Sequence, residues 1–308
     1  MAVTLDGVPL VIYRADGALH CLTDRCPHRS APLSGGVVAD GAIECPYHGW
    51  RFEGSGQCVA VPGMIGDVPR SFVPRHPICE KEGLIFVSLD RSPGEPYSGA
   101  LSGTNAALMM LENRVESTLA EVAENILDAT HTHFTHKGIL RGLSARRYRV
   151  TVTVSGGDGW VEARYEGESK QEGLVSRLFE GERSISVGRF IAPGIAELEF
   201  WGRSGPNLVT TFHLRQAGPD EVRGIGVLSG PRQAGLGLLK GLAFLPLFRI
   251  AIDQDQRILS AAHRRRKQFA EIRQMITPID VVRPHIDAIL AGRRPSVADA
   301  PVTVTMEL

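Results

Sequence analysis

Two short cysteine–histidine pairs near the N-terminus constrain this chain more than any other feature of its sequence. Cys26 and His28 form a C-x-H pair, and Cys45 and His48 form a C-x2-H pair after sixteen intervening residues. Two thiolates and two imidazoles can hold one zinc ion, or a [2Fe–2S] cluster with the cysteines on one iron and the histidines on the other. The C-x-H spacing is shorter than the usual zinc loop, and loops containing Pro and Gly suit backbone N–H donation to sulfide. The spacing therefore favours the cluster over zinc.

The two pairs resemble the ligand boxes of the Rieske iron–sulfur family, and this resemblance covers roughly residues 1–92. Short β-prone runs separated by Asp-Gly, Gly-Gly and Glu-Gly turns surround the pairs, so we expect residues 1–95 to form an all-β Rieske [2Fe–2S] domain. The other cysteines, Cys21, Cys58 and Cys79, are expected to be buried small hydrophobic residues. Five cysteines without an export signal also argue against a disulfide framework.

A second group of metal-ligand residue types follows in the stretch 125–136. Asn125, Asp128 and His131 are spaced three apart, so they share one face of a helix. His136 falls about 140° further round an ideal helix, so an irregular turn is needed to bring the two histidines together. Taken alone, this pattern is more often a surface pair or a helix cap than a metal site.

The remainder of the chain predicts an α+β domain. The sequence is rich in Pro, Gly and Ser from Arg91 to Thr104, so 96–112 is expected to be a linker and 113–276 the catalytic domain. After the histidine box, several runs alternate apolar and polar residues, which indicates an antiparallel sheet with one wet face. A helical pattern at 247–269 completes an α+β sandwich of a sheet with a helix against it, which resembles the helix-grip, START-like fold. Residues 277–308 are expected to be a C-terminal tail.

A Rieske module followed by N-x2-D-x2-H-x4-H and such a domain resembles the catalytic (alpha) subunit of the Rieske non-haem iron oxygenases. The resemblance implies four cluster ligands, Cys26, His28, Cys45 and His48. It makes His131 and His136 ligands of a mononuclear Fe(II), with positions left open for O₂. It makes Asp128 the bridging carboxylate that joins this iron to the cluster of a neighbouring subunit, which implies a homo-oligomer, commonly a trimer. Asn125 matches a frequent polar residue near the iron, although a helix-end amide is an equal alternative.

The third ligand of the mononuclear iron is expected to be Asp255 and not Asp253. The residues three and four positions away from Asp255 are all apolar, so its carboxylate projects from the buried stripe of the helix. A buried carboxylate needs a partner, and a cation held by two histidines provides one. Asp253 has Arg249 and Arg257 at helical spacing, which indicates an exposed face.

The substrate is expected to be an apolar, aromatic or cyclic small molecule. Besides Asn125, the candidate substrate-binding residues are Phe134, Leu140, Phe190, Trp201, Phe212 and Leu228. Most of these could equally be ordinary core residues.

The resemblance implies oxygenase chemistry with electrons from NAD(P)H. The chain has no Rossmann-type glycine motif and no second cysteine cluster, so a separate reductase, alone or with a ferredoxin, must supply the electrons. Hydroxylation, cis-dihydroxylation and demethylation all remain open. The alternative, a Rieske electron carrier without oxygenase activity, needs only about the first hundred residues.

Charge and hydropathy exclude other partner classes. The formal net charge is zero, which gives no electrostatic case for nucleic acid or an anionic membrane. The N-terminus lacks the pattern of a signal peptide and no apolar run approaches a membrane span, so a cytoplasmic protein is expected. The basic run 263–267 could dock an acidic reductase, but a solvated helix face is the favoured interpretation.

Overall fold

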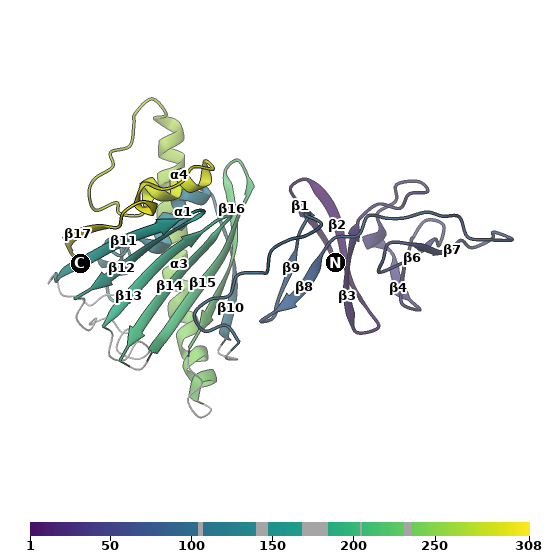
Figure 1. Ribbon diagram of the computed structural model, residues 1–308, viewed down its shortest axis with the longest axis horizontal. Coiled ribbons are helices and arrows are strands. Elements are labelled where there is room, and N and C mark those ends of the chain that lie inside the picture. The colour runs from purple at the N-terminus through teal and green to yellow at the C-terminus, as the bar shows by residue number, and fades with distance from the viewer. Residues whose placement is uncertain (104–106, 140–146, 168–183, 204, 231–235) are drawn as a thin grey trace. The chain divides into compact units, whose positions relative to one another are not determined.

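The chain forms two compact units, Met1–Pro96 and Tyr97–Leu308. The structure is a computed structural model, and it describes residues 1–103, 107–139, 147–167, 184–203, 205–230 and 236–308. Figure 1 shows both units with their elements labelled. Within the described residues, none of the helices combines the length and the hydropathy that a membrane crossing needs.

The first unit is built from short antiparallel strands. Its sheets are β1-β2-β3, β4-β5-β6-β7 and the ribbon β8-β9. The elements are β1 (Ala2–Leu5), β2 (Val8–Ala15), β3 (Ala18–Thr23), η1 (Leu33–Gly35), β4 (Val37–Ala39), β5 (Ala42–Glu44), β6 (Arg51–Glu53), β7 (Cys58–Ala60), β8 (Ile78–Lys81) and β9 (Leu84–Val87).

Four of these hairpins close through a two-residue turn with both residues at positive φ. The turns are Asp6-Gly7, Asp16-Gly17, Asp40-Gly41 and Glu82-Gly83, with φ between 47° and 79°. Such turns match the right-handed twist of the flanking strands, and Asp-Gly is a preferred sequence for them. The expected all-β domain is confirmed in its turns as well as its strands.

Four of the five cysteines in this unit are buried and one is exposed. Cys26 and Cys45 lie in its main core with Phe52, and Cys21 and Cys58 are buried as expected. The prediction was wrong for Cys79, which is exposed. Cys79 lies on β8 of the two-stranded ribbon, and a ribbon alone cannot cover both of its faces.

The second unit is an eight-stranded antiparallel sheet with helices. The sheet order is β10-β16-β15-β14-β13-β12-β11-β17. The strands are β10 (Ala107–Val115), β11 (Arg149–Gly157), β12 (Trp160–Glu166), β13 (Ile185–Ile191), β14 (Ile195–Gly202), β15 (Gly205–Gly218), β16 (Glu221–Ser229) and β17 (Val302–Glu307). The helical elements are α1 (Leu119–Leu127), α2 (Thr132–Thr135), α3 (Leu236–Gln268), α4 (Arg283–Leu290) and η3 (Ser296–Ala298).

The core of this unit lies between one face of the sheet and helices α1 and α4 (Figure 1). Alternate residues of β11 and β12 are buried, as period-two patterning requires. Leu127 of α1 and Ile286 of α4 share a cluster with Phe190 of β13. Helix α3 packs against β10, α1 and α2. The α+β class is confirmed.

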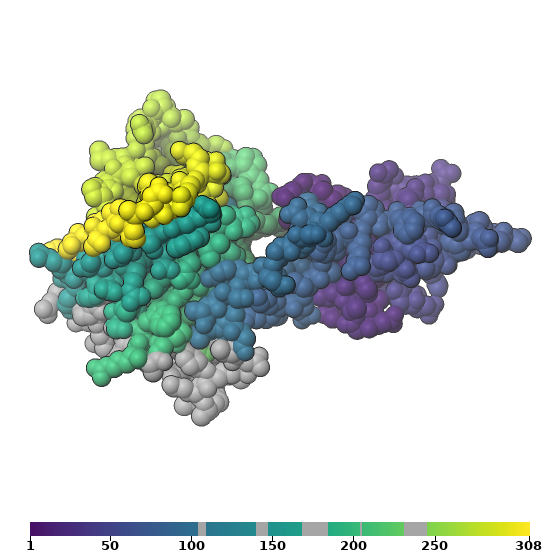
Figure 2. Space-filling model, viewed as in Figure 1, coloured from purple at the N-terminus to yellow at the C-terminus, as the bar shows by residue number. Residues whose placement is uncertain are grey.

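Two expected boundaries differ from the structure. The expected linker at 96–112 overlaps β10, which is the edge strand of the sheet next to β16. The expected tail at 277–308 is not a separate segment, because β17 pairs with β11 and α4 is buried in the core. Figure 2 shows this yellow segment lying across the teal strands. Because β17 pairs with a strand about 150 residues earlier, local patterning carried no signal for it.

Candidate metal centres

Helix α1 brings the first residues of the histidine box into position. It begins with a capping box, in which the side chains of Thr118 and Glu121 each accept a backbone N–H of the other residue. It ends at Leu127, and the next residue, Asp128, has an extended backbone. The helix therefore stops before His131 and does not continue through the box.

An irregular turn was expected between the two histidines, but it lies before His131, and one regular helical turn, α2, joins His131 to His136. Asp128 Oδ1 accepts hydrogen bonds from the backbone N–H and the hydroxyl of Thr130, both at 2.7 Å. Its Oδ2 accepts the backbone N–H of His131 at 3.2 Å. These side-chain bonds take the place of the backbone hydrogen bonds that a continued helix α1 would make. The single helical turn α2 then leads to His136.

Three donor atoms converge between this turn and helix α3. Nε2 of His131 lies 3.3 Å from Nε2 of His136, and Oδ1 of Asp255 lies 3.5 Å and 3.1 Å from these two nitrogens. Two ligands bound at about 2.1 Å with angles of 90–110° would lie roughly 3.0–3.4 Å apart. The spacing is therefore that of ligands around one ion.

The electrostatics of the triad also favour a cation. Burial disfavours charge on His131, but its contacts with Asp128 and Asp255 outweigh this and raise its pKa to about 9. Burial likewise opposes the charge on Asp255, yet His131 and His136 lower its pKa to about 2. Asp255 Oδ1 is buried and makes no hydrogen bond of good geometry with the described residues. A buried anionic oxygen aimed at two imidazole nitrogens fits a divalent metal ion.

Neighbouring residues on α3 have different environments. Gln254 Oε1 lies 2.9 Å from Nδ1 of His136, so the amide accepts the Nδ1–H and leaves Nε2 directed at the triad. Asp253 is exposed. The structure thus brings Asp255, and not Asp253, to the histidines, and it adds Gln254, to which the sequence reasoning gave no role.

The two cysteine–histidine loops of the first unit repeat one backbone design. Cys26 N–H donates to Ala31 O, and Cys45 N–H donates to Trp50 O, five residues on in each loop. In both loops the residue four positions after the cysteine, Ser30 or Gly49, donates its N–H to the cysteine carbonyl and has positive φ.

The two loops present thiols inward and imidazoles outward. Cys26 and Cys45 are buried, whereas His28 and His48 are exposed, with ring centroids 4.6 Å apart. The pKa of Cys26 is raised, mainly by burial and also by the neighbouring Cys45. The backbone N–H groups of His28 and Arg29 lower this pKa, but their effect is smaller. Among the described residues, only His131, His136 and Asp255 converge on a single ion position. Two buried sulfurs and two exposed rings that do not converge fit a mixed-ligand [2Fe–2S] cluster better than one zinc ion.

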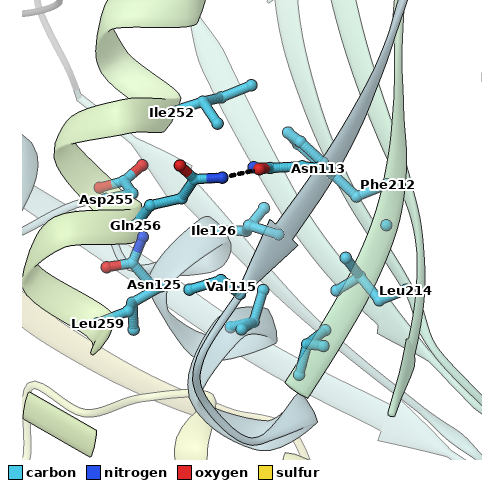
Figure 3. Close-up of a pocket in the computed structure, with 13 residues that line it drawn as sticks. Asn113, Val115, Asn125, Ile126, Phe212, Leu214, Ile252, Asp255, Gln256 and Leu259 are labelled. Carbon is cyan, nitrogen blue, oxygen red and sulfur yellow. Dashed lines mark hydrogen bonds between the residues drawn. The ribbon is translucent and has the colours of Figure 1, made fainter. Parts of the chain in front are cut away.

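A pocket reaches Asp255 from the side of the sheet (Figure 3). Asn125 and Phe212, both predicted to contact substrate, are among its lining residues. Most of the remaining wall comes from aliphatic side chains of α1, α3, β10, β15 and β16.

Four other candidate substrate residues do not line this pocket. Phe190 and Leu228 are fully buried core residues, and Phe134 is 72% exposed. Trp201 donates its indole N–H to Glu199. Leu140 lies outside the described residues. Aromatic residues occur on both faces of a strand and in loops, so residue type alone could not select those at the pocket.

The basic run 263–267 is not a purely solvated face, which was the favoured interpretation. His263 is 2% exposed and contacts Asp220 at 2.8 Å. Arg266 pairs with Glu121, and Lys267 pairs with Asp220. These charges join α3 to α1 and to the β15–β16 turn within one unit.

Comparisons with known proteins show relatives of this chain. A model of the Rieske [2Fe-2S] domain matches residues 1–72. The oxygenase component of dicamba O-demethylase from Stenotrophomonas maltophilia is 33% identical over 209 residues, which are 64% of this chain and 57% of that protein. Methylxanthine N3-demethylase NdmB from Pseudomonas putida is 36% identical over 153 residues, 46% of this chain and 42% of that protein.

Solved structures show the same fold over nearly the whole chain. Dicamba monooxygenase bound to 3,6-dichlorosalicylic acid aligns with a TM-score of 0.73 at 21% identity, covering 94% of this chain and 91% of that one. NdmA from Pseudomonas putida with caffeine aligns with a TM-score of 0.74 at 21% identity, covering 98% and 89%.

The chain therefore carries a Rieske [2Fe-2S] domain in its first unit. Over nearly its whole length it has the fold of solved oxygenases such as dicamba monooxygenase. In the sequence alignments the chain spans about half the length of the curated relatives it matches.

Proposed function

We propose that the protein is the terminal oxygenase component of a multicomponent Rieske system. It would use O₂, and electrons from NAD(P)H delivered by a separate reductase or ferredoxin, to oxidise an apolar, cyclic small molecule. The convergence of His131, His136 and Asp255 in a chain that also carries a Rieske domain supports this function above all. An electron carrier would have no use for a second metal site.

The proposed ligands divide between the two units. Cys26, His28, Cys45 and His48 would hold the [2Fe–2S] cluster, and His131, His136 and Asp255 would hold Fe(II). The cluster would supply electrons, and the mononuclear iron, with three protein ligands, would supply an open position for O₂ beside the substrate.

The residues around the iron position have separate tasks in this proposal. Gln254 holds the His136 ring through Nδ1, so that only Nε2 faces the metal. Asp128 Oδ2 lies 3.5 Å from Nδ1 of His131, an electrostatic contact that is looser than the hydrogen bond of Gln254 and would favour a proton on Nδ1. The two contacts would leave Nε2 of each imidazole for the metal.

Asp128 is also the proposed entry point for electrons. Its side chain is 30% exposed, and it lines a small pocket with Glu124, Thr130 and Asp280. Carboxylates at the surface can accept a hydrogen bond from the N–H of an incoming imidazole. We propose that a cluster histidine of a neighbouring subunit makes this bond, in a homo-oligomer, commonly a trimer in this family.

Demethylation is the first reaction to test among the three possible outcomes. Dicamba O-demethylase and NdmB are both named for removal of a methyl group. In such a reaction the methyl carbon is hydroxylated and leaves as formaldehyde.

The decisive assay is product analysis with a surrogate reductase and a panel of O-methyl and N-methyl aromatic compounds. The proposal predicts O₂-dependent formaldehyde or hydroxylated product, lost in His131→Ala. A protein whose cluster is reduced and reoxidised but that forms no product with any of the three chemistries would be an electron carrier instead.

A further inference from the structure

We infer that the cavity beside Asp255 binds the uncharged polar end of the substrate, a carbonyl or N–H group, through the carboxamides of Asn113 and Gln256. This inference rests on the proposed function and deepens it. It assigns the substrate to a chemical class: an apolar body with a neutral hydrogen-bonding group, not a carboxylate.

The cavity lies between helix α3, helix α1 and the sheet, next to the proposed ligand Asp255 (Figure 3). Its volume of about 60 Å³ leaves room for a small group and not for a whole ring. Ile126 of α1, Phe212 of β15 and Ile252 of α3 are among the side chains that make its walls apolar. A substrate could therefore place one end here while the rest of it extends out of the cavity.

Apart from Asp255, the polar side chains of the cavity are all carboxamides. Gln256 Nε2–H donates to Asn113 Oδ1, which joins α3 to β10. It also donates to the carbonyl of Arg114 at 3.0 Å, and Asn113 Oδ1 accepts the N–H of Arg114 at 2.8 Å. Both amides are thereby held in place.

These bonds leave complementary groups for a ligand. Gln256 Oε1 remains as an acceptor and Asn113 Nδ2 as a donor, with no hydrogen bond to another described side chain. The amide of Asn125, on α1, likewise makes no hydrogen bond within the described part of the chain and faces the same cavity. A carbonyl or N–H of the substrate can pair with either kind of group.

The described lining residues of the cavity offer an anion no cationic side chain. None of the described lining residues is a lysine, arginine or histidine, and the one charged group is the Asp255 carboxylate. The nearest cation along β10, Arg114, projects to the other face, where it is 70% exposed and paired with Glu221. A carboxylate in this cavity would lose its hydration and meet no cationic side chain, and the charge of the proposed Fe(II) would already be partly offset by Asp255, whereas a neutral amide would keep its hydrogen bonds.

The test compares three ligands with a common methoxybenzene body: 3-methoxybenzamide, the isosteric anion 3-methoxybenzoate, and anisole, which lacks the polar group. Their binding to the holoenzyme is measured by calorimetry without O₂. The benzamide should bind at least about tenfold more tightly than the benzoate. In Gln256→Leu and Asn113→Leu, the ratio of benzamide to anisole affinity should fall about two- to tenfold, the value of one hydrogen bond. This ratio does not depend on the fraction of folded protein.

Gln268→Leu is the matched control, because Gln268 is exposed on the same helix and should leave the ratio unchanged. Equal affinity for benzoate and benzamide, an unchanged ratio in Gln256→Leu, or no binding of any probe would overturn the inference. Anion-selective binding with O₂-dependent product would refute this inference and leave the oxygenase standing. Amide-selective binding without any product would refute only the proposed function.

Discussion

Replacing Gln254 with Leu should weaken the mononuclear iron site without touching any proposed ligand. The Gln254 amide accepts the Nδ1–H of His136 at 2.9 Å, and His136 is only 2% exposed, so water cannot replace the lost acceptor. A buried donor left without a partner costs roughly 1–3 kcal/mol. Lost partners of metal-binding histidines typically lower metal affinity by about 10- to 100-fold. We therefore expect a fall of that size.

The assay is Fe(II) competition against a chelator under anaerobic conditions, with the visible spectrum of the cluster as internal control. Gln254→Glu keeps an acceptor and should retain affinity within a few-fold. Gln268→Leu, a change of the same kind on an exposed part of the same helix, should have no effect. Affinity within twofold of the wild type in Gln254→Leu would show that this amide does not orient the His136 ring.

Three further predictions follow from the same site. Asp128→Asn should retain both metal centres and lose turnover; near-normal turnover would remove Asp128 from the electron route. Asp255→Ala should lose mononuclear iron and Asp253→Ala should keep it, as measured by iron analysis, and the opposite result would reverse the assignment. The pKa of His131, about 9, lies above its ordinary 6.5, so its charge stabilises the metal-free protein below pH 6.5, and this stabilisation is lost as pH rises through 9. Fe(II) must displace that proton, so its apparent affinity should rise about tenfold per pH unit between pH 7 and 9; a flat profile would refute this.

Local chemistry made much of this protein predictable. The Asp-Gly turns, the two cysteine–histidine loops and the break after Asp128 all depend on residues within a few positions of one another. The placement of Asp255 beside the histidines followed from one helical face, because a buried carboxylate needs a cation.

The remaining features depend on tertiary contacts that no local pattern encodes. Gln254 and Gln256 lie on either side of Asp255, but only the packing of α3 decides which partner each amide meets. Phe190 and Phe212 are both aromatic strand residues, yet one is core and the other lines the pocket. The pairing of β17 with β11 likewise required the folded sheet.

Metal and sulfide analysis of the purified, anaerobically reconstituted protein tests the central claim most directly. Two centres in one chain predict about three irons and about two acid-labile sulfides per chain. His131→Ala should lower the iron count to about two while the sulfide count and the cluster spectrum stay unchanged. A single zinc ion without sulfide, or two irons in both proteins, would contradict the account.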